Sequence, residues 1–285
     1  MSFPTDAWAI DRGADRRTHR TTARPETARI DRARAALAGS LESSTARPAS
    51  RRWAMENFQR GLRLGRELQD LVGPLAGKRL LEIGTAYGGD LTALHALGVS
   101  CVGTDHVVMN FPDLRRRLGD PPDFSFVRCS CMRRWPFADA SFDLLLCMEV
   151  IEFVENLDGF FSETCRVLRP DGVAVLTTPA GVRLLRHDPI YRLPVVGILP
   201  NRLRCWIAER ICGRGTDWRP SRHSLRSAGS LQRYVRRHRR RVTGMKFADS
   251  PIMARIRHWP AAGLLRRIIR QVDFDYLLLQ PVGTG

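Results

Sequence analysis

A glycine-rich turn follows a short apolar run in the first half of the chain. The run R-L-L-E-I-G covers residues 79–84, and E-I-G-T-A-Y-G-G-D leads from it into a helical pattern. Gly84, Gly88 and Gly89 let the backbone approach a ligand at distances that a Cβ atom would prevent. Asp105 ends the next apolar run, where its carboxylate can accept hydrogen bonds from both hydroxyls of a ribose. This combination predicts a site for an adenosine-containing cofactor.

Two classes of adenosine cofactor fit such a turn, and they differ in charge. A dinucleotide enzyme uses G-x-G-x-x-G, of which Gly84 and Gly89 are present while Ala86 takes the middle place. Glu82 stands beside the turn, where a carboxylate would repel a pyrophosphate but suits the cationic methionine end of S-adenosylmethionine. The sequence therefore favours S-adenosylmethionine, and a dehydrogenase ranks last among the functions considered.

Apolar runs of strand length alternate with helical patterns around this turn. The helical patterns cover residues 90–97 and 157–168. Besides residues 79–84, the apolar runs cover residues 99–105, 124–129, 173–179 and a stretch that begins at Phe142. Such alternation is typical of a parallel sheet covered on both faces. We therefore expect a doubly wound α/β domain with the cofactor at the carboxyl ends of its first two strands.

The flanking regions are less regular. Residues 1–50 are rich in Arg, Ala, Thr, Ser and Asp, and we expect a largely disordered basic segment there. Residues 52–72 have near-helical apolar spacing interrupted by two glycines, which predicts one helix or two short ones. The domain is expected over residues 51–285, with an apolar and basic insert at about 183–228. A basic helix near 229–241, a strand near 242–248 and a last strand over D-F-D-Y-L-L-L-Q-P-V complete it.

Positive charge is concentrated near the end of the chain. The formal net charge of the 285 residues is +17. Residues 181–285 carry 22 basic and 6 acidic side chains, whereas residues 78–180 carry 10 basic and 14 acidic ones. This asymmetry indicates contact with an anionic surface or a phosphate, and a solvated arginine-rich surface explains it equally well.

The seven cysteines do not indicate a disulfide framework, because their number is odd and most lie in apolar runs. Cys129 and Cys131 form a C-x-C pair without a second pair of ligands nearby, so no metal site is expected. No apolar run is long enough for a signal-peptide core or a membrane-spanning helix. The sequence predicts a cytoplasmic protein, with peripheral contact at a membrane surface left open.

Four blocks stand in order along the chain: K-R-L-L-E-I-G-T-A-Y-G, V-G-T-D, R-R-W-P-F-A-D-A-S-F-D-L-L-L-C-M-E-V-I-E-F-V and V-L-R-P-D-G-V-A-V-L-T-T-P. They resemble the class I S-adenosylmethionine-dependent methyltransferases, especially the ubiquinone/menaquinone-type branch. The resemblance covers about residues 55–180 clearly and 220–282 weakly. It implies a seven-stranded Rossmann-like sheet of order 3-2-1-4-5-7-6 with the seventh strand antiparallel.

The resemblance also implies where the cofactor binds. Glu82 would face the methionine end, Asp105 the ribose, and Cys131 and Met132 the adenine. The full set of expected cofactor residues is Glu82, Gly84, Thr85, Gly88, Asp105, His106, Cys131, Met132 and Met148.

Three positions depart from the family's pattern. Ala86 stands where the second glycine is usual, and Cys131 stands where an acid usually bonds the adenine amino group. Phe153 replaces the histidine of the family's E-H pair after strand four. Adenine would then rely on backbone groups and on packing near Met132, because a thiol is a weak acceptor. These departures motivate the alternative of a non-catalytic methyltransferase-like partner protein.

The sequence does not identify a general base. Glu149 and Glu152 follow the fourth strand, where a helix-start role explains them equally well. Other candidates near the expected acceptor side are His187, Asp188, Tyr191 and His223.

The patterns together predict methyl transfer to a small-molecule, glycan or lipid-linked acceptor. The apolar, arginine-bearing segment 189–212 motivates this class, because it suits a lid or a membrane contact, although packing on the sheet explains it as well. The basic tail motivates the alternative of RNA methylation. Nucleic acid is not favoured as a partner, because few aromatic residues lie among the arginines. The acceptor atom and the oligomeric state are not indicated.

Overall fold

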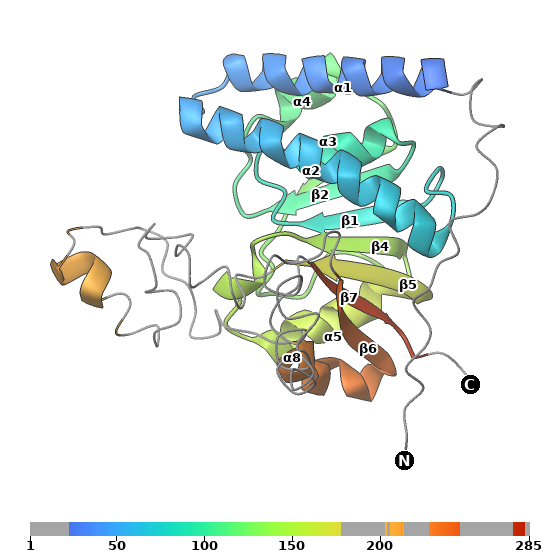
Figure 1. The fold of residues 1–285 in the computed structure, drawn as a ribbon, viewed down its shortest axis with the longest axis vertical. Coiled ribbons are helices and arrows are strands. Elements are labelled where there is room, and N and C mark those ends of the chain that lie inside the picture. The colour runs from blue at the N-terminus through green and yellow to red at the C-terminus, as the bar shows by residue number, and fades with distance from the viewer. Residues whose placement is uncertain are drawn as a thin grey trace, which may run out of the picture.

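The computed structural model describes residues 23–177, 203, 206–211, 213, 228–245 and 276–282. Its centre is a seven-stranded sheet of order β3-β2-β1-β4-β5-β7-β6 (Figure 1). The strands are β1 (Arg79–Ile83), β2 (Ser100–Asp105), β3 (Phe124–Arg128), β4 (Phe142–Cys147), β5 (Leu168–Leu176), β6 (Arg240–Met245) and β7 (Tyr276–Pro281). Strands β1 to β5 pair in parallel, and β7 runs antiparallel to β5 and β6. The expected strand order and the antiparallel seventh strand are confirmed.

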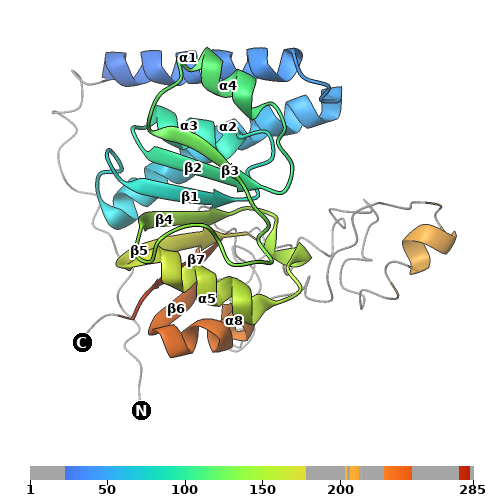
Figure 2. The ribbon, with the colours of Figure 1, turned by 180° about the vertical axis from the view of Figure 1, so that it is seen from behind.

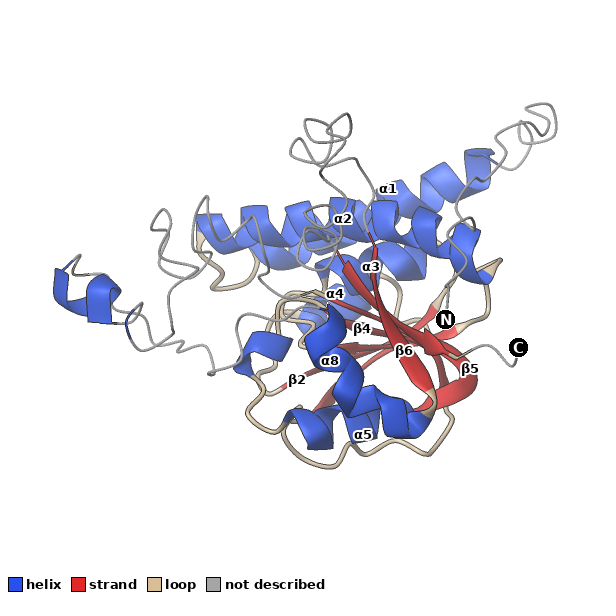
Figure 3. Ribbon diagram, turned by 60° about the horizontal axis from the view of Figure 1, so that its bottom comes forward, coloured by secondary structure: helices blue, strands red, loops and turns tan. Residues whose placement is uncertain are grey.

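Helices cover both faces of the sheet (Figures 2 and 3). One face carries α1 (Ala23–Glu42), α2 (Pro48–Val72), α3 (Gly89–Ala96) and α4 (Phe111–Arg117), and the other carries α5 (Leu157–Val167) and α8 (Ala228–Val235). Successive strand residues point to opposite faces. Leu80 and Leu144 therefore join the core under α1–α4, whereas Leu81 and Leu145 join the core under α5 and α8. This is the doubly wound arrangement that the alternating pattern predicts.

The first described helix differs from the expectation for residues 1–50. Residues 23–42 form α1, and α2 begins at Pro48, so the prediction of disorder is wrong for that part of the segment. Leu37 and Leu41 of α1 are fully buried, and the helix packs on α2, α3 and α4. Burial of this apolar stripe stabilises α1 against the domain, although its composition is rich in arginine and alanine. Residues 1–22 lie outside the described part of the chain.

Helix α2 is continuous through the two glycines that were expected to weaken it. A Cβ atom on Gly61 would lie 2.9 Å from Asp90 Cα, and one on Gly65 would lie 2.3 Å from Leu97 Cδ1. Both glycines therefore allow α2 to pack closely on α3. The tight packing offsets the cost of about 1 kcal/mol that each glycine adds to a helix interior.

The C-terminal elements differ in their bounds from the sequence-based expectation. The expected helix near 229–241 ends at Val235, and a 3₁₀ turn (Arg236–His238) leads into β6, which starts at Arg240 rather than near 242. Strand β5 likewise starts earlier, at Leu168. The Gln232 side chain donates to Arg240 O at 2.9 Å and accepts from Val242 N at 2.8 Å. The Gln232 amide thus forms hydrogen bonds with a carbonyl and an N–H group of β6, which is the edge strand of the described sheet.

Most of the expected insert at 183–228 lies outside the described residues. Within it the structure describes a short π-helix (Ile207–Ile211) and a few neighbouring residues. No helix in the described part of the chain is long and apolar enough to cross a membrane.

Candidate active site

A cavity of about 590 Å³ opens at the carboxyl ends of β1, β2 and β4, beside the first turn of α2. Its volume is within the range of small-molecule sites. Six of the nine expected cofactor residues line it: Gly84, Asp105, His106, Cys131, Met132 and Met148. Glu82, Thr85 and Gly88 do not. The parallel strands bring these residues together, because their carboxyl ends share one edge of the sheet.

The glycine turn keeps its shape through contacts with its own chain. Gly84 has φ +76°, and a Cβ atom there would lie 2.2 Å from Val150 Cγ2. A Cβ atom on Gly89 would lie 2.4 Å from Ala54 O of α2. At these two positions glycine is required by the protein's own packing, which differs from the sequence-based interpretation that a ligand requires it.

Ala86 has φ +46°, a conformation that favours glycine. Its N–H donates to Asp105 Oδ2 at 3.0 Å, which holds the turn against the end of β2. The turn therefore forms although alanine stands in the second glycine's place.

Asp105 is the main polar group of the cavity wall. Its Oδ1 accepts from Val107 N–H at 3.2 Å and lies 2.8 Å from His106 Nδ1. A carboxylate offers about four lone-pair directions, so Asp105 keeps acceptor capacity for a ligand's hydroxyls. His106 is exposed at the mouth of the cavity.

Glu82 lies beneath the turn rather than in the cavity. Its side chain is buried and accepts a hydrogen bond from Thr85 Oγ1. Burial and, to a lesser degree, the nearby Asp90 carboxylate together raise the pKa of Glu82 to about 8. The carboxyl group is thus largely protonated at neutral pH. The sequence-based argument that its charge selects a cationic cofactor has no support from this geometry.

The wall formed by residues 129–132 is uncharged. Burial raises the pKa values of the Cys129 and Cys131 thiols above their ordinary value, so both are neutral near pH 7. Met132 is half-exposed at the rim, and Met148 is buried at the inner wall. An aromatic ring fits between such side chains through dispersion and sulfur contacts.

Glu149 is the one general-base candidate in the described part of the chain that lines the cavity. Its backbone is left-handed at φ +59°, and its N–H donates to Thr177 Oγ1 at 2.7 Å. Arg60 of α2 lies 3.4 Å from its carboxylate and makes a paired contact with Asp90, at 2.6 and 3.1 Å. This network ties α2, α3 and the end of β4 together beside the cavity.

Among the remaining candidates the structure describes Glu152, which does not line the cavity. Glu152 is buried outside the lining, and burial raises its pKa to about 8. His187, Asp188, Tyr191 and His223 lie outside the described residues. No group of three His, Cys, Asp or Glu side chains in the described part of the chain is placed to hold a metal ion.

Several lining residues were not predicted from the sequence. Helix α2 contributes Ser50 and Trp53, and the segments after β1, β2 and β4 contribute Tyr87, Met109, Val150 and Phe153. Trp53 and Ser50 belong to a helix whose position over the sheet edge follows from tertiary packing, so no local motif marks them. Phe153 was noted only as a departure, and it forms part of the apolar wall.

Comparison with known proteins places this cavity in a family. A family profile described as "Methyltransferase domain" matches residues 81–176. Ubiquinone biosynthesis O-methyltransferase, mitochondrial, of Bos taurus is 29% identical over 138 residues, which make up 47% of this chain and 37% of that protein. Demethylmenaquinone methyltransferase of Tropheryma whipplei (strain Twist) is 27% identical over 142 residues, or 46% of this chain and 54% of that protein.

The fold comparison agrees with the sequence comparison. A putative sarcosine dimethylglycine methyltransferase from Galdieria sulphuraria aligns with a TM-score of 0.50 and 18% identity, over 78% of this chain and 85% of that chain. The matched segments of the two curated relatives span 37% and 54% of their lengths. The profile match covers strands β1 to β5, which carry the glycine turn and Asp105. Residues 81–176 therefore match a methyltransferase domain, in agreement with the resemblance of the chain to the class I S-adenosylmethionine-dependent methyltransferases.

Proposed function

We propose that the chain binds S-adenosylmethionine in the cavity of about 590 Å³ and methylates a small-molecule acceptor. The observation that carries this proposal is the meeting of the glycine turn, Asp105 and the neutral wall at residues 129–132 around one cavity. Asp105 would hold the ribose hydroxyls, and Cys131 and Met132 would contact the adenine. The backbone of the turn at residues 84–88 would face the methionine part.

The residues of the cavity fit the cofactor in size and polarity. When bound, S-adenosylmethionine would supply a sulfonium methyl group for transfer to an acceptor oxygen, nitrogen or carbon, and the electrons of the broken C–S bond would stay on sulfur. The cavity walls hold the acceptor in line and exclude water. Such positioning is worth about 7–11 kcal/mol in favourable cases.

Glu149 is suited to receive the proton that an acceptor hydroxyl or amine loses. It lines the cavity together with the apolar side chains Val150 and Phe153, which follow it in the segment after β4. A positioned base of this kind contributes about a hundredfold or more to the rate.

An apolar ring-containing acceptor fits the remaining walls. Trp53, Val150 and Phe153 offer flat or branched apolar surface on that side of the cavity. The names of the Bos taurus and Tropheryma whipplei relatives refer to the biosynthesis of ubiquinone and to demethylmenaquinone. We extend the acceptor class of this chain to small molecules of this kind, including glycan- or lipid-linked ones.

We also propose a peripheral contact with an anionic surface in the cytoplasm. Arg236, Arg237, Arg239 and Arg241 are exposed near the start of β6, and Asp158 lies 3.9 Å from Arg237. Leu203, Trp206 and Ile211 are exposed apolar side chains on the other described basic segment. Binding to vesicles with and without anionic lipid, at low and high salt, tests this contact, and equal binding to both vesicle types would contradict it.

Calorimetric titration with S-adenosylmethionine tests the proposed function, with NADH as the control ligand. We expect micromolar binding of S-adenosylmethionine and none of NADH. Methyl transfer from labelled cofactor to a panel of phenols, hydroquinones and glycosides then identifies the acceptor. Absence of S-adenosylmethionine binding by folded protein would refute the proposal and favour a non-catalytic partner.

A further inference from the structure

A second hollow of about 680 Å³ lies beside the cofactor cavity. It is formed by the C-terminal end of α1, the link to α2, and the segment that joins β2 to α4. Tyr87 and Met109 line both this outer hollow and the cofactor cavity. The two spaces are therefore neighbours, and a single acceptor can reach from one to the other.

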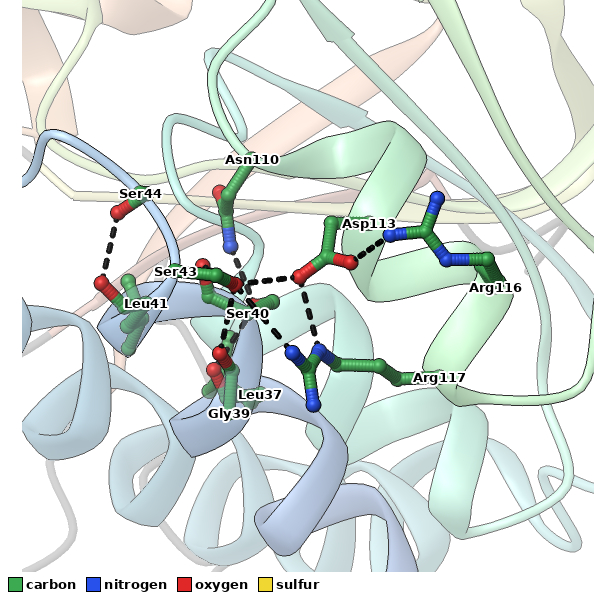
Figure 4. Close-up of polar contacts among 10 residues, drawn as sticks. All are labelled: Leu37, Gly39, Ser40, Leu41, Ser43, Ser44, Asn110, Asp113, Arg116 and Arg117. Atoms are coloured by element: carbon green, nitrogen blue, oxygen red, sulfur yellow. Dashed lines mark hydrogen bonds and ion pairs between the residues drawn. The ribbon is translucent and has the colours of Figure 1, made fainter.

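The polar wall of the outer hollow offers hydrogen-bond acceptors (Figure 4). Ser40 Oγ donates to Leu37 O at 2.8 Å, and Ser44 Oγ donates to Leu41 O at 2.7 Å. Ser43 Oγ is 2.7 Å from Asp113 Oδ2. Each hydroxyl thus donates its one proton within the chain, and each oxygen also accepts one hydrogen bond, from Asn110, Arg117 or Ala46, which leaves one acceptor direction on each oxygen. The wall therefore suits a ligand that brings several donors.

A buried amide adds an independent sign of a ligand. Asn110 is 5% exposed, lines the hollow, and donates from Nδ2 to Ser40 Oγ at 2.7 Å. Its Oδ1 is buried and has no hydrogen-bond partner among the described residues. Buried acceptors are normally satisfied, so this oxygen indicates a donor that the described residues do not supply.

The lining of the hollow carries one acidic and one basic side chain, Asp113 and Arg116, which balance each other. Asp113 pairs with Arg116 and with Arg117, whose Nε lies 2.8 Å from Oδ2. A cation would meet the arginines, and a polyanion would meet the carboxylate. The lining therefore suits a neutral ligand.

The opposite wall is apolar and exposed. Val107, Val108 and Met109 are three consecutive large apolar side chains that are 38–44% exposed. Exposed apolar side chains gathered in one hollow mark a binding surface more often than scattered ones do. A neutral ligand with hydroxyl donors on one side and C–H groups on the other is a sugar ring.

We propose that the outer hollow binds the sugar portion of a glycosylated acceptor, with its hydroxyls toward Asn110 and the serines and its C–H face toward Val107–Met109. This inference rests on the proposed methyltransferase function and names the acceptor class for it. The rest of the acceptor extends past Tyr87 and Met109 into the cofactor cavity.

Saturation-transfer NMR with methyl α-D-glucopyranoside, methyl α-D-mannopyranoside and methyl α-L-rhamnopyranoside tests the proposal. Cyclohexanol serves as a probe of similar ring size with one hydroxyl, and 1-octanol as a hydrocarbon probe. The variants are Asn110→Ala, which removes the unpaired oxygen, and Val108→Ser, which changes an exposed residue and leaves the fold intact. Val282→Ser, at another exposed apolar position, is the matched control.

We expect at least one glycoside to show stronger saturation than cyclohexanol, and its signal to fall threefold or more in both hollow variants but not in Val282→Ser. Signals from cyclohexanol or 1-octanol alone, equal signals from glycosides and cyclohexanol, or glycoside signals unaffected by both variants would overturn the inference. Calorimetry with S-adenosylmethionine on the same samples separates the two proposals. Cofactor binding without glycoside binding defeats only the sugar site, whereas absence of cofactor binding defeats the proposed function.

Discussion

Replacing Asp105 by asparagine removes a charge from the cofactor cavity while preserving the shape of the side chain. In the wild-type chain the two carboxylate oxygens accept from Ala86 N–H at 3.0 Å and Val107 N–H at 3.2 Å. An asparagine keeps one acceptor oxygen, and its amide NH₂ must face either one of these donors or the ligand. The substitution therefore weakens both the turn and the proposed ribose contact.

The size of the effect follows from the hydrogen bonds at stake. A hydrogen bond to a charged group is worth about 1.5–3 kcal/mol, against about 1 kcal/mol for a neutral pair. Two ribose hydroxyls that lose a charged acceptor thus lose about 2 kcal/mol together, which is about thirtyfold in affinity. The disturbed contact with Ala86 adds to this loss.

Calorimetric titration of S-adenosylmethionine into the wild-type and Asp105→Asn proteins measures the difference. Asp120→Asn is the matched control, because Asp120 is an exposed carboxylate with φ +52°, a conformation that asparagine accepts. Thermal unfolding of each variant verifies that it folds. An unchanged dissociation constant for folded Asp105→Asn would refute the assignment of the ribose to Asp105.

Three further substitutions test the surroundings of the cavity. Glu82 keeps its proton in the folded chain up to about pH 8, whereas in the unfolded chain it loses it near its ordinary pKa of 4.5. The free energy of unfolding should therefore fall by about 1.4 kcal/mol for each pH unit between these values. Glu82→Gln should remove most of this slope, as measured by urea unfolding at several pH values. A slope that Glu82→Gln leaves unchanged would assign it to another group. Arg60→Leu leaves the buried Asp90 carboxylate unpaired and should lower the free energy of unfolding by about 3–5 kcal/mol. The double variant Arg60→Leu/Asp90→Asn should recover part of this loss. A loss below about 1 kcal/mol in Arg60→Leu would contradict the role of the ion pair. Cys131→Asp should tighten S-adenosylmethionine binding about fivefold, because a charged acceptor gains about 1 kcal/mol over a thiol, and weaker calorimetric binding would place the adenine elsewhere.

The sheet could be predicted from the sequence because its signals are local. Each strand is a short apolar run, and the order in which the strands pair was inferred from the resemblance of four sequence blocks to the methyltransferase family. The bounds of β1 to β3 and the start of β4 agree with the structure within a residue. The start of β6 was misplaced, because it depends on Gln232 and β7 rather than on the local pattern.

Helix α1 was missed because its buried stripe combines two leucines with small residues. Ala33, Leu37 and Leu41 are buried at helical spacing, but alanine and the surrounding arginines give little apolar contrast. Propensity alone seldom decides such a helix, since tertiary packing provides most of its stability. The same dependence on packing hid Ser50 and Trp53, whose place in the cavity follows from how α2 lies over the sheet edge.

The departures from the family's pattern differ in what they change. Ala86 adopts a left-handed conformation that costs an L-residue about 1–2 kcal/mol. Its N–H bonds a carboxylate at 3.0 Å, and such a bond is worth about 1.5–3 kcal/mol, so the strain is offset and the turn keeps its shape. Phe153 lines the cavity with an apolar ring where the family's pattern has a histidine. Cys131, by contrast, removes a charged acceptor and leaves a neutral thiol at the adenine end. If adenine binds at Cys131 as proposed, the affinity for the cofactor is the property in which this chain should differ from members that have an acid at that position.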